Sequence, residues 1–201
     1  MLDHNRYALK EWAIILKALS EGQQVLLLRK GGLIERNARF KVEHTEFFIY
    51  PTYLHQQRRG IVPPWTATLE HIMATPPPEG QVILSHYAVV QQLFKITDPD
   101  RVQTLSDFHV LNKEEVQKRF FYGETPGLHL LLLRVFQLVT PFRLPVRSSY
   151  VGCRSWVDLG RELPTSGCRP VLNDDAFDRE ARRVIARISP SVILPVQPQR
   201  T

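Results

Sequence analysis

The longest apolar segment, residues 128–139, limits the folds open to this chain. It is shorter than the about 18 to 20 apolar residues of a membrane span, and it contains His129 and Arg134. Such a segment predicts a long strand, or a strand that bends, in a packed core. A 201-residue chain with 43% hydrophobic residues can bury this core without disulfides or a structural metal. Cys153 and Cys168 are too few to form a framework of either kind.

Shorter patterns predict the other elements. Strands are expected at 25–28, 40–43, 47–50 and 82–90, with a strand pair within 150–159. Helices are expected at 7–20, between an N-cap at Asn5 and a stop at Gly22, and at 63–72, 112–121 and after Asn173. Pro51 is expected to end the strand before it, because proline donates no hydrogen bond to a sheet.

These elements predict one α+β domain at residues 1–189. Its sheet is expected to be small and mixed or barrel-like, and to be covered by the N-terminal and C-terminal helices. Residues 190–201 contain Pro190, Pro195 and Pro198, so they are expected to form a Pro-rich extended tail.

The formal net charge is +6, and it is unevenly distributed. Residues 29–59 and 143–201 each carry a net +4, residues 60–142 carry −2, and residues 1–28 are neutral. A local positive field attracts phosphates and other anions. The distribution therefore favours RNA or DNA as a partner, although basic residues also serve solubility.

No motif in the sequence identifies a catalytic centre. The seven histidines contain no His-Glu-x-x-His pattern, and Cys-x-x-Cys is absent from the sequence. No lysine follows an acidic residue by two positions, as in restriction-type nucleases, and there is no Gly-x-Ser-x-Gly elbow. The pair Gly31-Gly32 lacks the Gly-Lys-Ser/Thr of a triphosphate-binding loop. We therefore predict no catalytic residue, no metal site and no cofactor.

Two segments combine the side chains that a nucleic-acid site needs. The first follows a predicted strand, where cations and an unobstructed glycine backbone suit a phosphate. The second follows the strand at 47–50 and offers groups that can contact bases and phosphates. The candidate nucleic-acid-binding residues are Arg29, Lys30, Gly31, Gly32, Thr52, Tyr53, His55, Gln56, Arg58 and Arg59. If both segments line one groove, the chain is a non-catalytic nucleic-acid-binding module.

Two other functions stay open. Glu43, Glu46 and His55 could serve a metal-assisted phosphodiesterase or nuclease. A basic face could instead dock on an acidic protein, for example within a processing complex. The first residues lack the order of a secretion signal, so we expect a cytoplasmic protein that does not enter a membrane.

Several motifs together resemble a known family. They are Leu9-Lys10-Glu11-Trp12, Lys17-Ala18-Leu19 with Gly22, Leu26-Leu27-Leu28-Arg29-Lys30-Gly31-Gly32, Phe47, Pro51-Thr52, His55-Gln56, residues 130–134 and Ser155-Trp156-Val157. They resemble the domain of unknown function 1802 family of bacteria and archaea. Family members are associated with a restriction-endonuclease-type domain, for which this chain has no room. The resemblance therefore implies a link to nucleic-acid processing, restriction or defence.

A second similarity concerns the fold. The order of a helix, Gly22 and a strand that ends in Arg29 is similar to that in the PUA-like barrels, including the ASCH group. That group tends to have Lys and Glu where this chain has Gln24 and Leu27. The similarity implies a PUA-like barrel.

Overall fold

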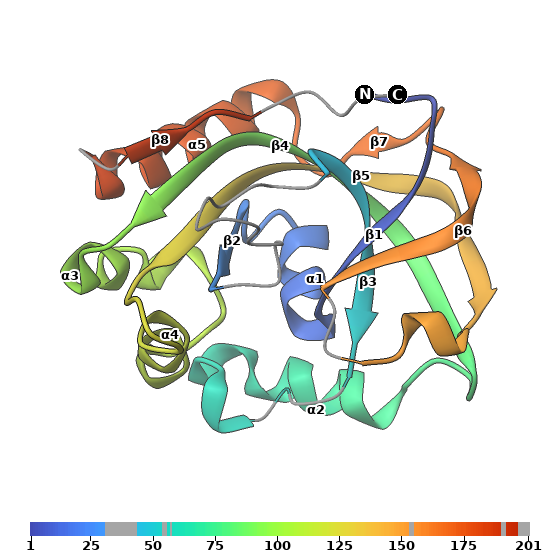
Figure 1. Ribbon diagram of the computed structural model, residues 1–201, viewed down its shortest axis with the longest axis horizontal. Coiled ribbons are helices and arrows are strands. Elements are labelled where there is room, and N and C mark those ends of the chain that lie inside the picture. The colour runs from blue at the N-terminus through green and yellow to red at the C-terminus, as the bar shows by residue number, and fades with distance from the viewer. Residues whose placement is uncertain (31–43, 54–55, 57, 153–154, 190–191, 197–201) are drawn as a thin grey trace.

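The structure is a computed structural model that describes residues 1–30, 44–53, 56, 58–152, 155–189 and 192–196 (Figure 1). The strands are β1 (His4–Trp12), β2 (Leu26–Arg29), β3 (Glu46–Thr52), β4 (Gln81–Ile96), β5 (Leu128–Pro145), β6 (Trp156–Pro164), β7 (Arg169–Pro170) and β8 (Val192–Leu194). The α-helices are α1 (Ala13–Ser20), α2 (Thr66–Ala74), α3 (Pro99–Gln103), α4 (Lys113–Phe120) and α5 (Asp174–Ile188). Among the described residues, we find no helix that is long and apolar enough to cross a membrane.

The strands form one mixed sheet in the order β2-β5-β4-β3-β1-β6, with β7 paired to β5 and β8 to β4. β1 and β3 are parallel, and the other strand pairs are antiparallel. The long strands β4 and β5 bend into an arch with α1 inside the curve (Figure 1). Two register shifts in their pairing accompany this bend, since an extra residue kinks a strand. The prediction of an α+β fold with a mixed sheet is confirmed, although the sheet has eight strands and is larger than expected.

Both faces of the sheet are buried at β1 and β3. Leu9 and Phe47 belong to the larger core, which also contains side chains of α1. Their neighbours in the sequence, Ala8 and Phe48, belong to a second core. Successive side chains of a strand point to opposite faces. A strand covered on both faces therefore shows no alternation of apolar and polar residues.

The predicted helix at 7–20 is wrong over its first half. Residues 4–12 form β1, and the helix begins only at Ala13. Asn5 is not an N-cap: it is buried, and its Nδ2 donates to Glu46 O and to Tyr87 Oη, each at 2.8 Å. Pairing with β3 on one side and β6 on the other outweighs the helical spacing of the apolar residues.

Two other predictions need correction, and one cannot be compared. Pro51 lies within β3, opposite Glu11, beyond the point where pairing with β4 ends at Phe48. There the missing N–H removes no bond to β4. Tyr150 lies in a 3-10 turn, and the described residues 150–152 and 155–159 contain the start of β6 as their only strand. The expected strand at 40–43 lies outside the described residues.

The best predictions concern helix ends. Asn173 caps α5 by accepting from Ala176 N, and Asn112 caps α4 by accepting from Glu115 N, both at 2.9 Å. The predicted domain boundary at residue 189 stays a prediction.

Candidate nucleic-acid interface

The carboxyl-terminal ends of β1, β2 and β3 surround one cavity. β1 and β3 are parallel, with Trp12 opposite Thr52, so their ends lie side by side. The cavity has a volume of about 770 Å³. Its other walls come from the end of α4, from the start of β4 and from the segment between β5 and β6. Four of the ten candidates line it, namely Arg29, Lys30, Thr52 and Tyr53.

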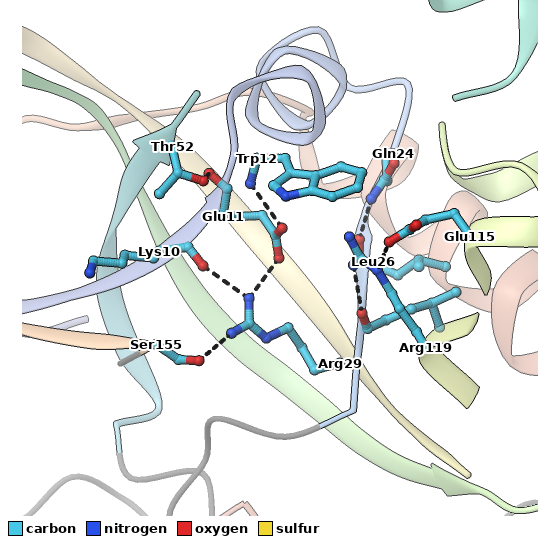
Figure 2. A network of polar contacts seen from close by, with 11 residues as sticks. Lys10, Glu11, Trp12, Gln24, Leu26, Arg29, Thr52, Glu115, Arg119 and Ser155 are labelled. Carbon is cyan, nitrogen blue, oxygen red and sulfur yellow. Dashed lines mark hydrogen bonds and ion pairs between the residues drawn. The ribbon is translucent and has the colours of Figure 1, made fainter. Parts of the chain in front are cut away.

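Arg29 is held inside the protein by an ion pair with Glu11 (Figure 2). Arg29 Nη1 donates to Glu11 Oε2 and to Lys10 O, both at 2.9 Å, and Nη2 donates to Ser155 Oγ at 2.7 Å. The two side chains are only 11% and 3% exposed. This guanidinium therefore joins β1, β2 and the residue before β6, and the charge expected to bind a phosphate is largely cancelled by Glu11.

Lys30 closes the carboxyl-terminal end of α4. Its Nζ donates to Phe120 O at 2.9 Å, to Gly127 O at 3.1 Å and to Thr125 O. Carbonyl oxygens at a helix end are unpaired by the helix itself and carry partial negative charge, so they attract an ammonium. Lys30 thereby fixes the turn that follows α4 while it also lines the cavity.

Thr52 and Tyr53 place hydroxyl groups at the cavity wall. Thr52 Oγ1 donates to Glu11 O at 3.1 Å, which leaves its lone pairs as acceptors. Burial raises the pKa of the Tyr53 phenol. Burial and, to a smaller extent, Tyr150 raise the pKa of Tyr50 in the same wall. These phenols therefore stay neutral near pH 7 and can donate hydrogen bonds.

Trp12 and Arg119 form a stacked pair in the cavity. The Arg119 guanidinium lies over the indole, 4.6 Å from the ring centroid. Its Nε donates to Glu115 Oε1 at 2.9 Å and its Nη1 to Leu28 O at 3.4 Å (Figure 2). The indole face and these partners orient the cation without removing it from the cavity lining.

Three other candidates lie outside the cavity lining. Gln56 is buried: its Oε1 accepts from Ile14 N at 3.3 Å, in the first turn of α1, and its Nε2 donates to Met73 Sδ at 3.0 Å. Arg58 is exposed and pairs with Glu70 at 3.2 Å. Arg59 is exposed, and its carbonyl accepts from Asn112 Nδ2 at 2.5 Å. Gly31, Gly32 and His55 lie outside the described residues.

Glu46, considered for metal-assisted cleavage, lies at the other end of β3. Thr52 lies six positions further along the strand, which corresponds to about 20 Å. Glu46 Oε2 accepts from Leu2 N at 2.8 Å and from Tyr87 Oη at 3.1 Å. Glu43 and His55 are not described, and the described residues contain no cluster of three metal-ligating side chains. Glu46 therefore takes no part in this cavity.

Several lining residues were not among the candidates: Lys10, Trp12, Tyr50, Arg119, Tyr122 and Tyr150. Lys10 and Trp12 were missed because their segment was predicted to be helical. The aromatic residues come from separate parts of the chain, and only the bent sheet brings them together.

Comparison with known proteins adds a family and three structures. The family described as "Domain of unknown function (DUF1802)" matches residues 8–183. The crystal structure of ASCH from Zymomonas mobilis is 12% identical, with 88% of this chain and 93% of that chain covered and a TM-score of 0.45. Two structures of mutants of that protein match with TM-scores of 0.41 and 0.38, at 12% and 13% identity. They cover 88% and 91% of this chain, and 96% and 99% of theirs. No curated protein matches.

Proposed function

Because the chain belongs to the DUF1802 family, whose description names no activity, we propose its function from its own geometry: it is a non-catalytic nucleic-acid-binding module. The observation that carries this proposal is the cavity at the ends of β1, β2 and β3. Its volume of about 770 Å³ lies within the range of about 300 to 1,000 Å³ that is typical of small-molecule sites. A nucleotide of an extended strand fits a space of this size.

The chemistry of the lining suits a nucleotide. Five aromatic side chains contribute to it: Tyr50 and Tyr150 are buried, whereas Trp12, Tyr53 and Tyr122 are more exposed. Aromatic rings bind bases by stacking, and every base has a face that can stack. The hydroxyls of Tyr53 and Tyr122 and the acceptor on Thr52 can hydrogen-bond the base edge or the ribose, whereas the Tyr150 hydroxyl already donates to Leu159 O at 2.9 Å.

The charge of the lining suits phosphates. Its charged side chains are four cations (Lys10, Arg29, Lys30 and Arg119) and one anion (Glu11), which gives 4 − 1 = +3. Arg29 pairs with Glu11 and Arg119 pairs with Glu115, each with an N–O distance of 2.9 Å, so part of this charge is balanced within the protein. Lys10 Nζ lies beside Gly152 O, to which it donates at 3.0 Å. Arg58 and Arg59 stay predicted outer contacts.

The lining favours binding over nucleophilic chemistry. Ser155 Oγ accepts its hydrogen bond from Arg29, and a guanidinium cannot take up the hydroxyl proton. Among the described residues, no histidine lines the cavity. A serine without an adjacent base is not activated as a nucleophile. The module would hold nucleic acid for a processing or defence partner.

The test is fluorescence anisotropy with labelled RNA and DNA oligonucleotides at several salt concentrations. We expect affinity to fall as salt rises, because phosphate contacts release counterions. Lys10→Ala should weaken binding and reduce the logarithmic salt slope by about 0.7 to 0.9. The matched control is Lys118→Ala, an exposed lysine of α4 outside the lining. Absence of binding, or affinity that does not change with salt, would refute the proposal.

A further inference from the structure

Exposed apolar side chains gather at the mouth of the cavity. The described residues contain eight large hydrophobic side chains that are exposed. Three of them line the cavity: Tyr122 (73% exposed), Val146 (39%) and Val151 (68%). A fourth, Phe121 (56%), precedes Tyr122 in the chain. Apolar surface that concentrates at one site marks a place where another molecule binds.

The turn that carries the two aromatic residues is firmly held. α4 ends at the buried Phe120, and Phe120 O accepts from both Gly127 N, at 3.0 Å, and Lys30 Nζ, at 2.9 Å. Phe121 N donates to Gln117 O at 3.0 Å, and its ring packs edge-on against that of Phe120 with 5.0 Å between centroids. A ring on an ordered backbone loses little further freedom when a ligand binds.

We infer that Tyr122 and Phe121 form a stacking platform for the base next to the nucleotide in the cavity, so that the ligand is an unpaired strand. This inference rests on the proposed function. A base can stack on a protein ring only when its own face is uncovered, and in a duplex the neighbouring base pairs cover both faces. The nucleotide in the cavity must likewise leave any duplex.

The charge beside the platform determines the choice of occupant. A hydrophobic protein segment would also cover exposed rings, but the charged residues of the lining next to them sum to +3, or to +2 when Glu115, the partner of Arg119, is included. A polyanion whose bases are flat and apolar matches both features, since its phosphates face the cations while its bases stack. A single-stranded nucleic acid is therefore the occupant that fits the platform and the cavity together.

The experiment compares a labelled nine-nucleotide strand with a blunt duplex of the same sequence, as RNA and as DNA. We expect the single strand to bind at least about tenfold more tightly. Tyr122→Ala should weaken single-strand binding by about 5- to 150-fold, the effect of losing one stacked base. Tyr122→Phe, which keeps the ring, should bind within about twofold of the wild type. Val139→Ala, an exposed apolar residue outside the lining, should have no effect.

Abasic strands locate the contact. Each strand of a series lacks one base, at a different position. The strand that lacks the base stacked on Tyr122 should bind the wild type and Tyr122→Ala with equal affinity. Equal affinity for duplex and single strand, or an unchanged affinity of Tyr122→Ala, would overturn the platform. If Lys10→Ala still weakens binding in that case, the proposed function stands without the platform. If no oligonucleotide binds, both proposals fail.

Discussion

The ion pair between Arg29 and Glu11 should contribute strongly to stability, although it lies among residues that line the cavity. Both side chains are mostly buried, and the N–O distance is 2.9 Å. Arg29→Met leaves the carboxylate of Glu11 without its cation and also removes the donors to Lys10 O and Ser155 Oγ. Removal of one partner of a buried pair costs about 3 to 5 kcal/mol. That is a large part of the about 5 to 15 kcal/mol by which a typical domain is stable.

The double variant separates this mechanism from a simple loss of packing. In Glu11→Met/Arg29→Met no charge is left buried, so the free energy of unfolding should be no lower than in Arg29→Met alone. Urea denaturation with linear extrapolation measures the wild type, Glu11→Met, Arg29→Met and the double variant. The matched control is Arg58→Met, which breaks the exposed pair with Glu70 and should not change the midpoint measurably. The reasoning is refuted if Arg29→Met behaves like this control, or if the effects of the two single variants add in the double variant.

Three further predictions concern the turn after α4, the buried His86 and the end of α1. Lys30→Met removes the donors to Phe120 O and Gly127 O, so amide hydrogen exchange in residues 121–127 should become faster while exchange in β5 stays slow. Burial lowers the pKa of His86 to about 4, below the unfolded value of about 6.5, so its contribution is complete above pH 6.5 and is lost as the pH falls towards 4. Between pH 6.5 and pH 5 this loss is about 1.5 kcal/mol. The urea midpoint of the wild type should therefore fall between these two pH values, and the midpoint of His86→Gln should fall by less. Gly22 has a φ of +68°, and a Cβ there would lie 2.5 Å from Leu172 Cδ2, so Gly22→Ala should lower the melting temperature. Gly123 has a φ of +77° but no atom close to the added Cβ, so Gly123→Ala should lower the melting temperature less.

Local signals predicted the first residues of α4 and α5 well. The Asn173 cap and the acidic first turn of α5 depend only on neighbouring residues, and the structure confirms them. The segment 4–12 was misjudged because Ala8 and Trp12 are spaced as on a helix, whereas Leu9 is equally buried. Burial on both faces comes from strands that lie far away in the sequence. A local window cannot contain that information.

The candidate site was predicted in part. The sequence placed Arg29 and Thr52 in one groove, and both line the cavity. The sequence could not show that Glu11 would neutralise Arg29, because the pair depends on how β1 lies beside β2. Gln56 carries an amide that could contact a base. That amide instead accepts from Ile14 N, which lies in the first turn of α1 and has no partner within the helix. Polar side chains that the sequence cannot distinguish thus lie either in the cavity lining or in contacts that support the fold.

The position of β1 in the sheet has a consequence for synthesis of the chain. β1 lies between β3 and β6, and the bidentate contact of Arg6 with Asp158 spans 152 residues of sequence. At a translation rate of about 5 to 20 residues per second, the ribosome needs about 8 to 30 s to make the second partner after the first. During that interval one edge of the first strand stays unpaired, and an unpaired edge invites other strands to join it. The nascent chain should therefore be most prone to aggregate, and most dependent on chaperones, until β6 has left the ribosome.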